Sequence, residues 1–232
     1  MYQLVFSPRW FFGKDVIIDL VTVAALFTIF VFAIKYYKIN KNKNYLWFGM
    51  AFLLMALSFI FKIATNFTIY YNVWHVKQIG PVLFTYKVLK KSDLLFYTGF
   101  LMYRVLMLLG LYVLFTRYIK QNNYVKILIL YLLITIAYFS DYAYYVFHLT
   151  SFALLAMLAY HYFQNYQNRK VVSNLLLFAS FALITLTQII FVFVFYQPIF
   201  YVVAQMVQLV AYIMLIITLI MVQNYGKKKR KK

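Results

Sequence analysis

The chain of 232 residues contains no cysteine, no glutamate and only three prolines. Without cysteine it forms no disulfides, zinc–thiolate sites or iron–sulfur clusters, and thiolate catalysis is excluded. Pro8, Pro81 and Pro198 lie outside or at the edges of the long apolar runs, so proline breaks no helix interior there. This placement argues against transporters that are built on discontinuous helices.

Charge is also scarce and strongly one-sided. Charged residues make up 12% of the chain, and 23 Lys and Arg against 4 Asp give a net charge of +19. In a soluble protein such a balance indicates nucleic-acid binding. Here the basic residues lie between long apolar runs, and 66% of the residues are hydrophobic, against about half in soluble domains. We therefore expect a multi-pass protein of the cell membrane, with the lipid bilayer as its surroundings and no nucleic-acid partner.

Seven runs are apolar enough to cross the hydrocarbon core as helices, which takes about 20 residues each. They cover roughly 15–37, 45–71, 94–117, 124–140, 141–165, 170–196 and 198–222. The fourth and fifth touch at Ser140-Asp141, so a merged pair is the alternative to two separate spans. The N-terminus lacks the basic, apolar and small-residue order of a cleavable signal peptide, so we expect the first run to be retained.

The predicted fold is therefore an all-α bundle, a single seven-helix transmembrane domain over residues 15–226. An outer interfacial segment over residues 1–14 precedes it, since Trp10, Phe11 and Phe12 beside Arg9 are typical of a stretch lying at the membrane surface. An outer loop covers 72–93, and a basic cytoplasmic tail covers 227–232. Tyrosines and tryptophans at the span ends, such as Tyr36, Tyr45 and Tyr162, are interpreted as an interfacial aromatic belt.

Orientation is predicted from the basic residues, because short cytoplasmic loops retain Lys and Arg. One side holds Lys35, Lys38, Lys41, Lys43, Arg117, Lys120, Lys126, Arg169, Lys170 and residues 227–232. The other side holds Arg9, Lys14, Lys77, Lys87, Lys90 and Lys91, together with the acids Asp15, Asp19, Asp93 and Asp141. The asymmetry places the N-terminus outside and the C-terminus inside. The tail is interpreted as an anchor that sets topology, with binding of anionic lipid as the alternative role.

Polar residues within the spans lie in the outer half of the membrane. At 1.5 Å per residue, Asp19 lies about 6 Å from the outer end of its span and Arg104 about 15 Å. Helical spacing aligns polar side chains on one face of five spans: Asp15, Asp19 and Thr22; Ser58, Lys62 and Asn66; Tyr131, Thr135 and Tyr138; Asp141, Tyr144 and His148; Tyr201, Gln205, Gln208 and Tyr212. We expect these stripes to converge on an outward-facing pocket that is closed below by apolar side chains.

Ionisable side chains within spans are costly and are candidates for function. The candidate ligand-binding residues are Asp19, Lys62, Asn66, Arg104, His148, Gln188, Gln205 and Gln208. The alternative is purely structural, because amides often join helices by hydrogen bonds. In that interpretation Arg104 with Asp19, or Lys62 with Asp141, form ion pairs.

Metal, cofactor and catalytic sites are not expected. Metal sites need several ligands at close spacing, and no HxxxH or HExxH motif is present. Ser140, Asp141 and His148 supply the residue types of a nucleophile and base, but nothing in their spacing is diagnostic. The last span has no lysine to bind retinal as a Schiff base. We therefore expect a protein that is not an enzyme and has no cofactor.

Over residues 15–222 the size, the short loops and the outward polar half resemble the seven-helix sensor regions that precede kinase domains in prokaryotic histidine kinases. The abundance of Lys, Tyr, Phe, Ile and Asn also resembles membrane proteins of archaea with AT-rich genomes. The first resemblance implies a sensor or receptor for a small ligand that signals through a membrane or cytoplasmic protein partner, and Lys62 and Arg104 are expected to attract an anionic group of that ligand. A structural subunit of a larger membrane complex and a transporter or channel for small anions or lipids are the alternatives.

Overall fold

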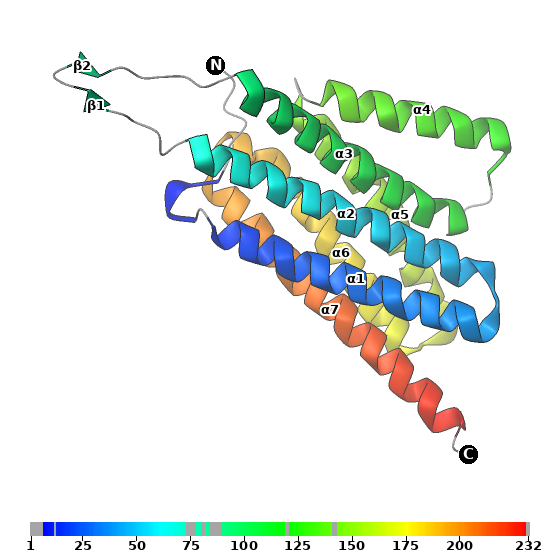
Figure 1. The fold of residues 1–232 in the computed structure, drawn as a ribbon. Helices are drawn as coiled ribbons and strands as arrows, with labels where there is room; N and C mark the ends of the chain where they lie inside the picture. The colour runs from blue at the N-terminus through cyan, green and yellow to red at the C-terminus, as the bar shows by residue number, and fades with distance from the viewer. Residues whose placement is uncertain are drawn as a thin grey trace.

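The structure is a computed structural model, and it describes residues 7–11, 13–72, 78–79, 82–83, 90–118, 121–140 and 143–230. Side chains are described for these residues except 9, 67–72, 78–79, 82–83, 90–96 and 223–230. Within these limits the chain forms an elongated bundle of antiparallel helices, with α1 beginning at one end and α7 finishing beyond the other (Figure 1).

Seven α-helices are found among the described residues, and each overlaps one of the predicted apolar runs. They are α1 (Lys14–Asn40), α2 (Lys43–Asn72), α3 (Lys90–Tyr118), α4 (Asn123–Phe139), α5 (Tyr144–Arg169), α6 (Val172–Val192) and α7 (Ile199–Arg230). Six of them are long and apolar enough to cross a membrane, and α4 is the shorter one. With 17 residues, α4 is about 25 Å long. The predicted all-α bundle with apolar helices of membrane-spanning length is thus confirmed, while the number of seven spans stays a prediction.

The six long helices form a closed ring in the order α1, α2, α3, α5, α6, α7, in which each packs against the next and α7 packs against α1. Helix α4 lies outside the ring, mainly against α3 (Figure 1). The core inside the ring is made of large apolar side chains that are fully buried, among them Leu26, Phe52, Leu111, Leu155 and Phe181. The six helices of the ring therefore contribute side chains to one common interior.

Helices α2 and α3 approach closely because glycines remove side chains at the contact. A Cβ on Gly110 would lie 2.6 Å from Met55 Cγ and 2.9 Å from the Ala51 carbonyl oxygen. A Cβ on Gly99, three turns earlier on α3, would collide with the Thr65 side chain. Small residues at helix contacts let backbones pack tightly in membrane proteins, and here they fix the position of α3 beside α2.

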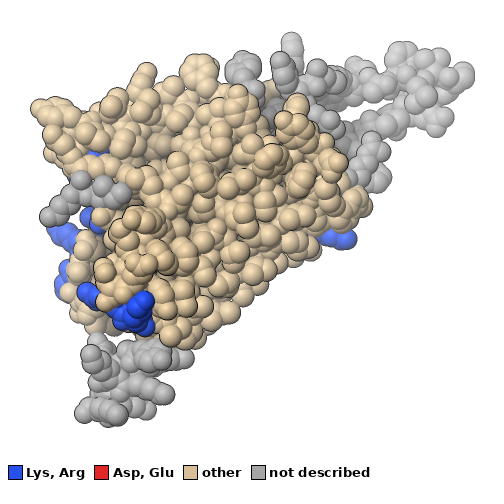
Figure 2. Space-filling model, turned by 180° about the vertical axis from the view of Figure 1, so that it is seen from behind, with Lys and Arg blue, Asp and Glu red and all other residues tan. Residues whose placement is uncertain are grey.

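The two ends of the bundle differ in charge. At the end where α1 finishes, here called the basic end, Lys35, Lys38, Lys41, Arg169 and Lys170 are exposed. Figure 2 shows most of the visible Lys and Arg side chains gathered at one end of the molecule, while the broad described flank carries apolar and uncharged side chains. The other end, where α1 begins, is called the N-terminal end.

Three predicted boundaries differ from the structure. Helix α3 begins at Lys90, inside the predicted outer loop 72–93, and the short strands β1 (Gln78–Ile79) and β2 (Val82–Leu83) pair antiparallel within that loop. Helix α7 continues to Arg230, so the first part of the predicted tail is helical. Helix α6 ends in the 3-10 turn η2 (Phe193–Phe195), just before Pro198, which cannot continue a helix.

The predicted interfacial segment contains the 3-10 turn η1 (Arg9–Phe11). Trp10 is 58% exposed, as expected for a residue at a membrane surface, but Phe11 is 1% exposed. The Phe11 ring lies edge-on to the Tyr201 ring at 6.4 Å, in a small apolar cluster with Ile18, Phe191 and Val194. Part of this segment therefore packs into the N-terminal end of the bundle.

Candidate functional site

The predicted polar residues lie inside the ring, in the half of the bundle toward the N-terminal end. All eight are buried, and they come from α1, α2, α3, α5, α6 and α7: Asp19, Lys62, Asn66, Arg104, His148, Gln188, Gln205 and Gln208. This set is called the polar cluster below. Helical periodicity on each strongly apolar span thus identified side chains that the fold buries.

Asp19 and Lys62 form the centre of the polar cluster. The Lys62 ammonium donates a hydrogen bond to Asp19 Oδ1 at 2.9 Å. Asp19 thus pairs with Lys62 and not with Arg104 as predicted, whereas the alternative pairing of Lys62 with Asp141 is not tested, because Asp141 lies outside the described residues. The reason is the order of the ring, since α2 stands between α1 and α3 and carries Lys62 directly to the acid.

Aromatic rings also lie close to the Lys62 ammonium. Its Nζ atom lies 5.5 Å from the centre of the Phe59 ring and 6.0 Å from the centres of the Tyr103 and Tyr201 rings. Ring faces attract a cation electrostatically, and the attraction grows when water is excluded. Phe59 precedes Lys62 by three residues and shares its face, so its spacing was a signal that the sequence analysis missed, whereas Tyr103 and Tyr201 reach Lys62 only through the fold.

A second bonded pair joins α5 to α6. His148 Nδ1 and Gln188 Oε1 are 2.8 Å apart, so the imidazole donates from Nδ1 in this arrangement. The His148 ring stacks on Phe191 at 4.9 Å, and Phe191 in turn contacts the Tyr201 ring at 5.9 Å. Rings therefore connect the two bonded pairs across the interior.

Helix α7 lines the cluster with two glutamines. The Gln205 amide donates to the Tyr201 hydroxyl at 3.3 Å, and Asp19 interacts electrostatically with both Lys62 and Gln205. Gln208 follows one turn later, also buried. Arg104 on α3 is buried beside Phe100, whose ring centre is 5.7 Å from its guanidinium carbon. Charged and amide side chains thus line one interior region from several helices.

No protein-family model, curated protein or solved structure matches this chain significantly.

Several buried atoms in the polar cluster, and one on the neighbouring residue Thr22, have no hydrogen-bond partner in the structure. They are Asp19 Oδ2, Gln205 Oε1, Asn66 Nδ2 and Thr22 Oγ1. Buried polar atoms are nearly always satisfied by protein groups, ordered water or a ligand. Two of the four accept hydrogen bonds only, one donates only, and the Thr22 hydroxyl does both. The cluster is therefore able to bond a small group that carries both donors and acceptors.

One predicted stripe does not reach this site. Tyr131 and Tyr138 on α4 are 64% and 62% exposed, because α4 lies outside the ring and turns this face away from it. The stripes of α1, α2 and α7 are buried as expected. Sequence periodicity identifies a shared face but gives no information about whether that face turns inward.

Metal ligands and nucleophile–base pairs form a further class of possible site. Among the described residues there is no group of three or more His, Cys, Asp or Glu that could hold a metal ion. The Ser140 hydroxyl donates to the Ala137 carbonyl at 2.8 Å, while His148 is bonded to Gln188. These two side chains therefore have other partners, and Asp141 lies outside the described residues.

The predicted outward pocket stays a prediction, because most of the outer loop 72–93 at this end lies outside the described residues. A cavity of about 390 Å³ instead lies at the basic end. Its lining includes Tyr36, Tyr45, Tyr118 and Tyr162. The sequence interpretation assigned Tyr36, Tyr45 and Tyr162 to the aromatic belt and missed this cavity, although tyrosines at the same end of several spans were a visible signal.

Proposed function

We propose that the chain is a seven-span membrane receptor with its N-terminus outside and its C-terminus inside. The helix directions support an odd number of crossings, because α1 begins and α7 ends at opposite ends of the bundle (Figure 1). The exposed lysines and arginines at the basic end support the inside assignment. In this topology the polar cluster occupies the outer half of the membrane.

The polar cluster is the proposed ligand site. The observation that carries this proposal is the set of buried atoms without partners, Asp19 Oδ2, Gln205 Oε1 and Asn66 Nδ2, beside a paired ammonium and a buried guanidinium. A purely structural cluster is expected to satisfy its own members. A bound ligand, or water that occupies the site before the ligand binds, would form hydrogen bonds with these atoms.

The ligand that fits is small and polar and has an anionic group together with a hydrogen-bond donor. Lys62 and Arg104 supply the positive charge for the anionic group, and the Asn66 amide supplies a donor. Asp19 Oδ2 and Gln205 Oε1 accept from the donor of the ligand. The protein acts by binding and not by catalysis.

Signalling through a protein partner follows from the position of Asp19 and Lys62. Their bond joins α1 to α2, and both helices continue to the basic end. A ligand that bonds either member changes how strongly the two helices are held together. A ligand shifts a conformational equilibrium by its difference in affinity for the two states, so the basic end is where a membrane or cytoplasmic partner would detect the change.

The proposal is tested by thermal unfolding of the purified chain with glycine, inorganic phosphate and methylamine as probes. A ligand that binds the folded state raises the unfolding midpoint by an amount that grows with the logarithm of its concentration relative to its Kd. We expect glycine, which carries both a carboxylate and an ammonium group, to stabilise the chain more than methylamine does. Arg104→Leu should fold and insert but lose the shift, whereas Gln167→Leu, an exposed glutamine at the basic end, should keep it.

Other outcomes favour the alternatives. If Arg104→Leu keeps the shift, or no probe shifts the midpoint, the polar cluster is structural, and a subunit of a larger membrane complex becomes the better proposal. Uptake of labelled phosphate or glycine into vesicles that contain the chain would indicate a transporter. Buried Phe59 and Tyr212, whose rings meet edge-on between the cluster and the basic end, argue against an open path.

A further inference from the structure

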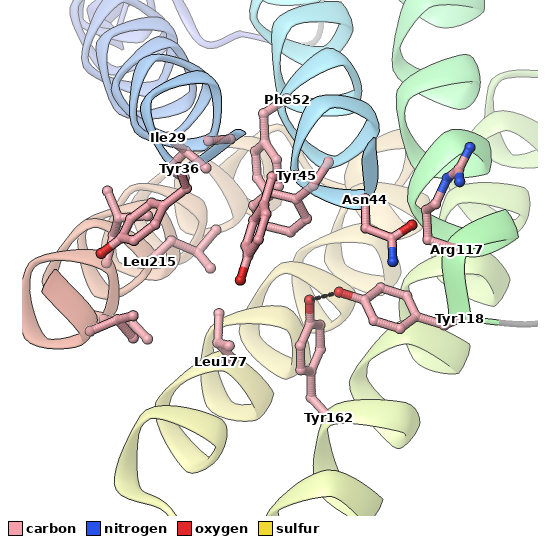
Figure 3. A pocket seen from close by; sticks show the side chains of 15 residues that line it. Ile29, Tyr36, Asn44, Tyr45, Phe52, Arg117, Tyr118, Tyr162, Leu177 and Leu215 are labelled. Carbon is pink, nitrogen blue, oxygen red and sulfur yellow. Dashed lines mark hydrogen bonds between the residues drawn. The ribbon is translucent and has the colours of Figure 1, made fainter. Parts of the chain in front are cut away.

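A second site lies at the basic end, independent of the polar cluster. The cavity of about 390 Å³ is enclosed by α1, α2, α3, α5, α6 and α7, which are the six helices of the ring. Ligand pockets in proteins commonly have volumes of about 300–1,000 Å³. Figure 3 shows side chains from these helices arranged around the space, with the Tyr45 hydroxyl and the bonded Tyr118–Tyr162 pair facing it.

The lining changes from polar to apolar with depth. On α1, α2 and α3 the lining residues near the basic end include Tyr36, Asn44, Tyr45 and Arg117, whereas the innermost lining residues of α1, α2 and α7 are Ile29, Phe52 and Leu215. The positions from Tyr36 to Ile29 on α1 span about 10 Å. The cavity is thus a short apolar recess with a polar mouth, which is the distribution that an amphiphile requires.

The mouth lies in a positively charged region. Arg117 is exposed and places its guanidinium 4.8 Å from the Trp47 ring centre, which holds it at the rim. Lys41 lies in the turn between α1 and α2, and Lys43 is the first residue of α2, next to Asn44. Among the described residues of this end there is no Asp or Glu. A focused positive potential attracts anions and repels cations.

We propose that this cavity binds an anionic amphiphile, with its aliphatic chain between Ile29, Phe52 and Leu215 and its carboxylate or phosphate at Asn44, Tyr45 and Arg117. The floor is closed, because Phe52 and the residues beyond it belong to the buried core. The chain therefore enters from the basic end and stops inside the ring. A neutral lipid would leave the polar mouth unused.

The ligand is either a free long-chain carboxylate or an acidic phospholipid of the same leaflet, and both present this chemistry. Binding of labelled decanoate is measured on the full chain in nanodiscs of phosphatidylcholine, against empty nanodiscs. We expect saturable binding that decanol does not displace. Repeating the measurement in phosphatidylglycerol nanodiscs separates the sources, since loss of decanoate binding there indicates that the phospholipid occupies the site.

Two variants with matched controls locate the binding. Arg117→Glu reverses the charge at the mouth and should weaken decanoate binding about tenfold or more, as expected for the loss of a charge-assisted hydrogen bond. Arg169→Glu, exposed at the same end but outside the cavity lining, should weaken it less. Leu219→Trp fills the cavity and should abolish binding, whereas Leu149→Trp on the exposed face of α5 should not.

The inference is overturned if decanoate binding is not saturable, if decanol competes equally, or if Arg117→Glu and Arg169→Glu bind alike. Because Arg117 is exposed, its variant remains informative if Leu219→Trp fails to fold. Failure of this test leaves the proposed receptor site untouched, since glycine and phosphate are not amphiphiles and the polar cluster lies at the opposite half of the bundle.

Discussion

The ammonium of Lys62 on α2 lies 2.9 Å from Oδ1 of Asp19 on α1, and both side chains are almost completely buried. Removing one member of a buried ion pair typically costs about 3–5 kcal/mol, because the other charge is left without compensation. We expect Asp19→Asn and Lys62→Met each to destabilise the chain in this range. The double variant should cost much less than the sum, and unfolding in detergent measures all three.

Additive losses in that double-mutant cycle would contradict the pairing, since coupling is the signature of contact. Lys35→Met is the matched control, because Lys35 is an exposed lysine of α1 at the basic end. Its removal should change stability by only a few tenths of a kcal/mol. The cycle also separates this pairing from the one between Asp19 and Arg104, which the sequence had suggested.

Phe11 is buried and its neighbour Trp10 is exposed, and this difference gives a second prediction. Phe11→Ala removes a buried ring that contacts Tyr201, so it should cost about 3–5 kcal/mol. Trp10→Ala removes a ring that is mostly exposed, although Lys14 lies over it, and it should cost far less. Equal unfolding midpoints for the two variants would show that the N-terminal segment does not pack into the bundle.

Gly110→Ala tests the close approach of α2 and α3. The added Cβ would lie 2.9 Å from the Ala51 carbonyl oxygen, which is a backbone atom and moves only with the helix. Overpacking of this kind costs about 1–3 kcal/mol, more than the gain of about 1 kcal/mol in helix propensity. Gly49→Ala, whose Cβ would meet the Ala33 Cβ at 3.1 Å, should be milder. A more stable Gly110→Ala variant would refute this packing.

The proposed topology is tested by single cysteines, for which the chain is well suited because it has none. Cysteines at Asn42, Asn122 and Gln167 should resist an impermeant thiol reagent in intact cells. A cysteine at Gln78, in the loop between α2 and α3, should react. The cysteine-free parent is the control, and labelling of the first three positions would invert the proposed orientation.

Apolar run length and helical spacing were sufficient to predict the helices and most buried polar positions. Lys62 and Gln205 are buried because a polar residue in an otherwise apolar span avoids lipid, a rule that needs no knowledge of neighbours. The partner of Asp19 was not predictable in the same way. It depends on which helices are adjacent, and short loops permit several ring orders that bring different helices beside α1.

The tyrosines illustrate a second limit. Tyr160 is 62% exposed and Tyr162 is 5% exposed, although both lie at the same end of α5 and were assigned together to the aromatic belt. A tyrosine near a helix end has an apolar ring and a polar tip, which suits both a membrane interface and the mouth of an internal cavity. The residue type is the same at an interface and at a cavity mouth. Only the direction in which the helix face points, toward lipid or toward the interior, distinguishes the two tyrosines.

Helix α4 contributes few side chains to the interior, yet the direction in which the later helices cross the bundle depends on it. Helix α3 finishes at the basic end and α5 starts at the N-terminal end, so α4 serves as the return passage between them. Without it, α5, α6 and α7 would each cross the bundle in the opposite direction. His148, Gln188 and Gln205 would then lie at the wrong level along the bundle axis to be near Lys62. A different apolar helix of equal length should therefore replace α4 with little loss, provided that it delivers the chain to the same side.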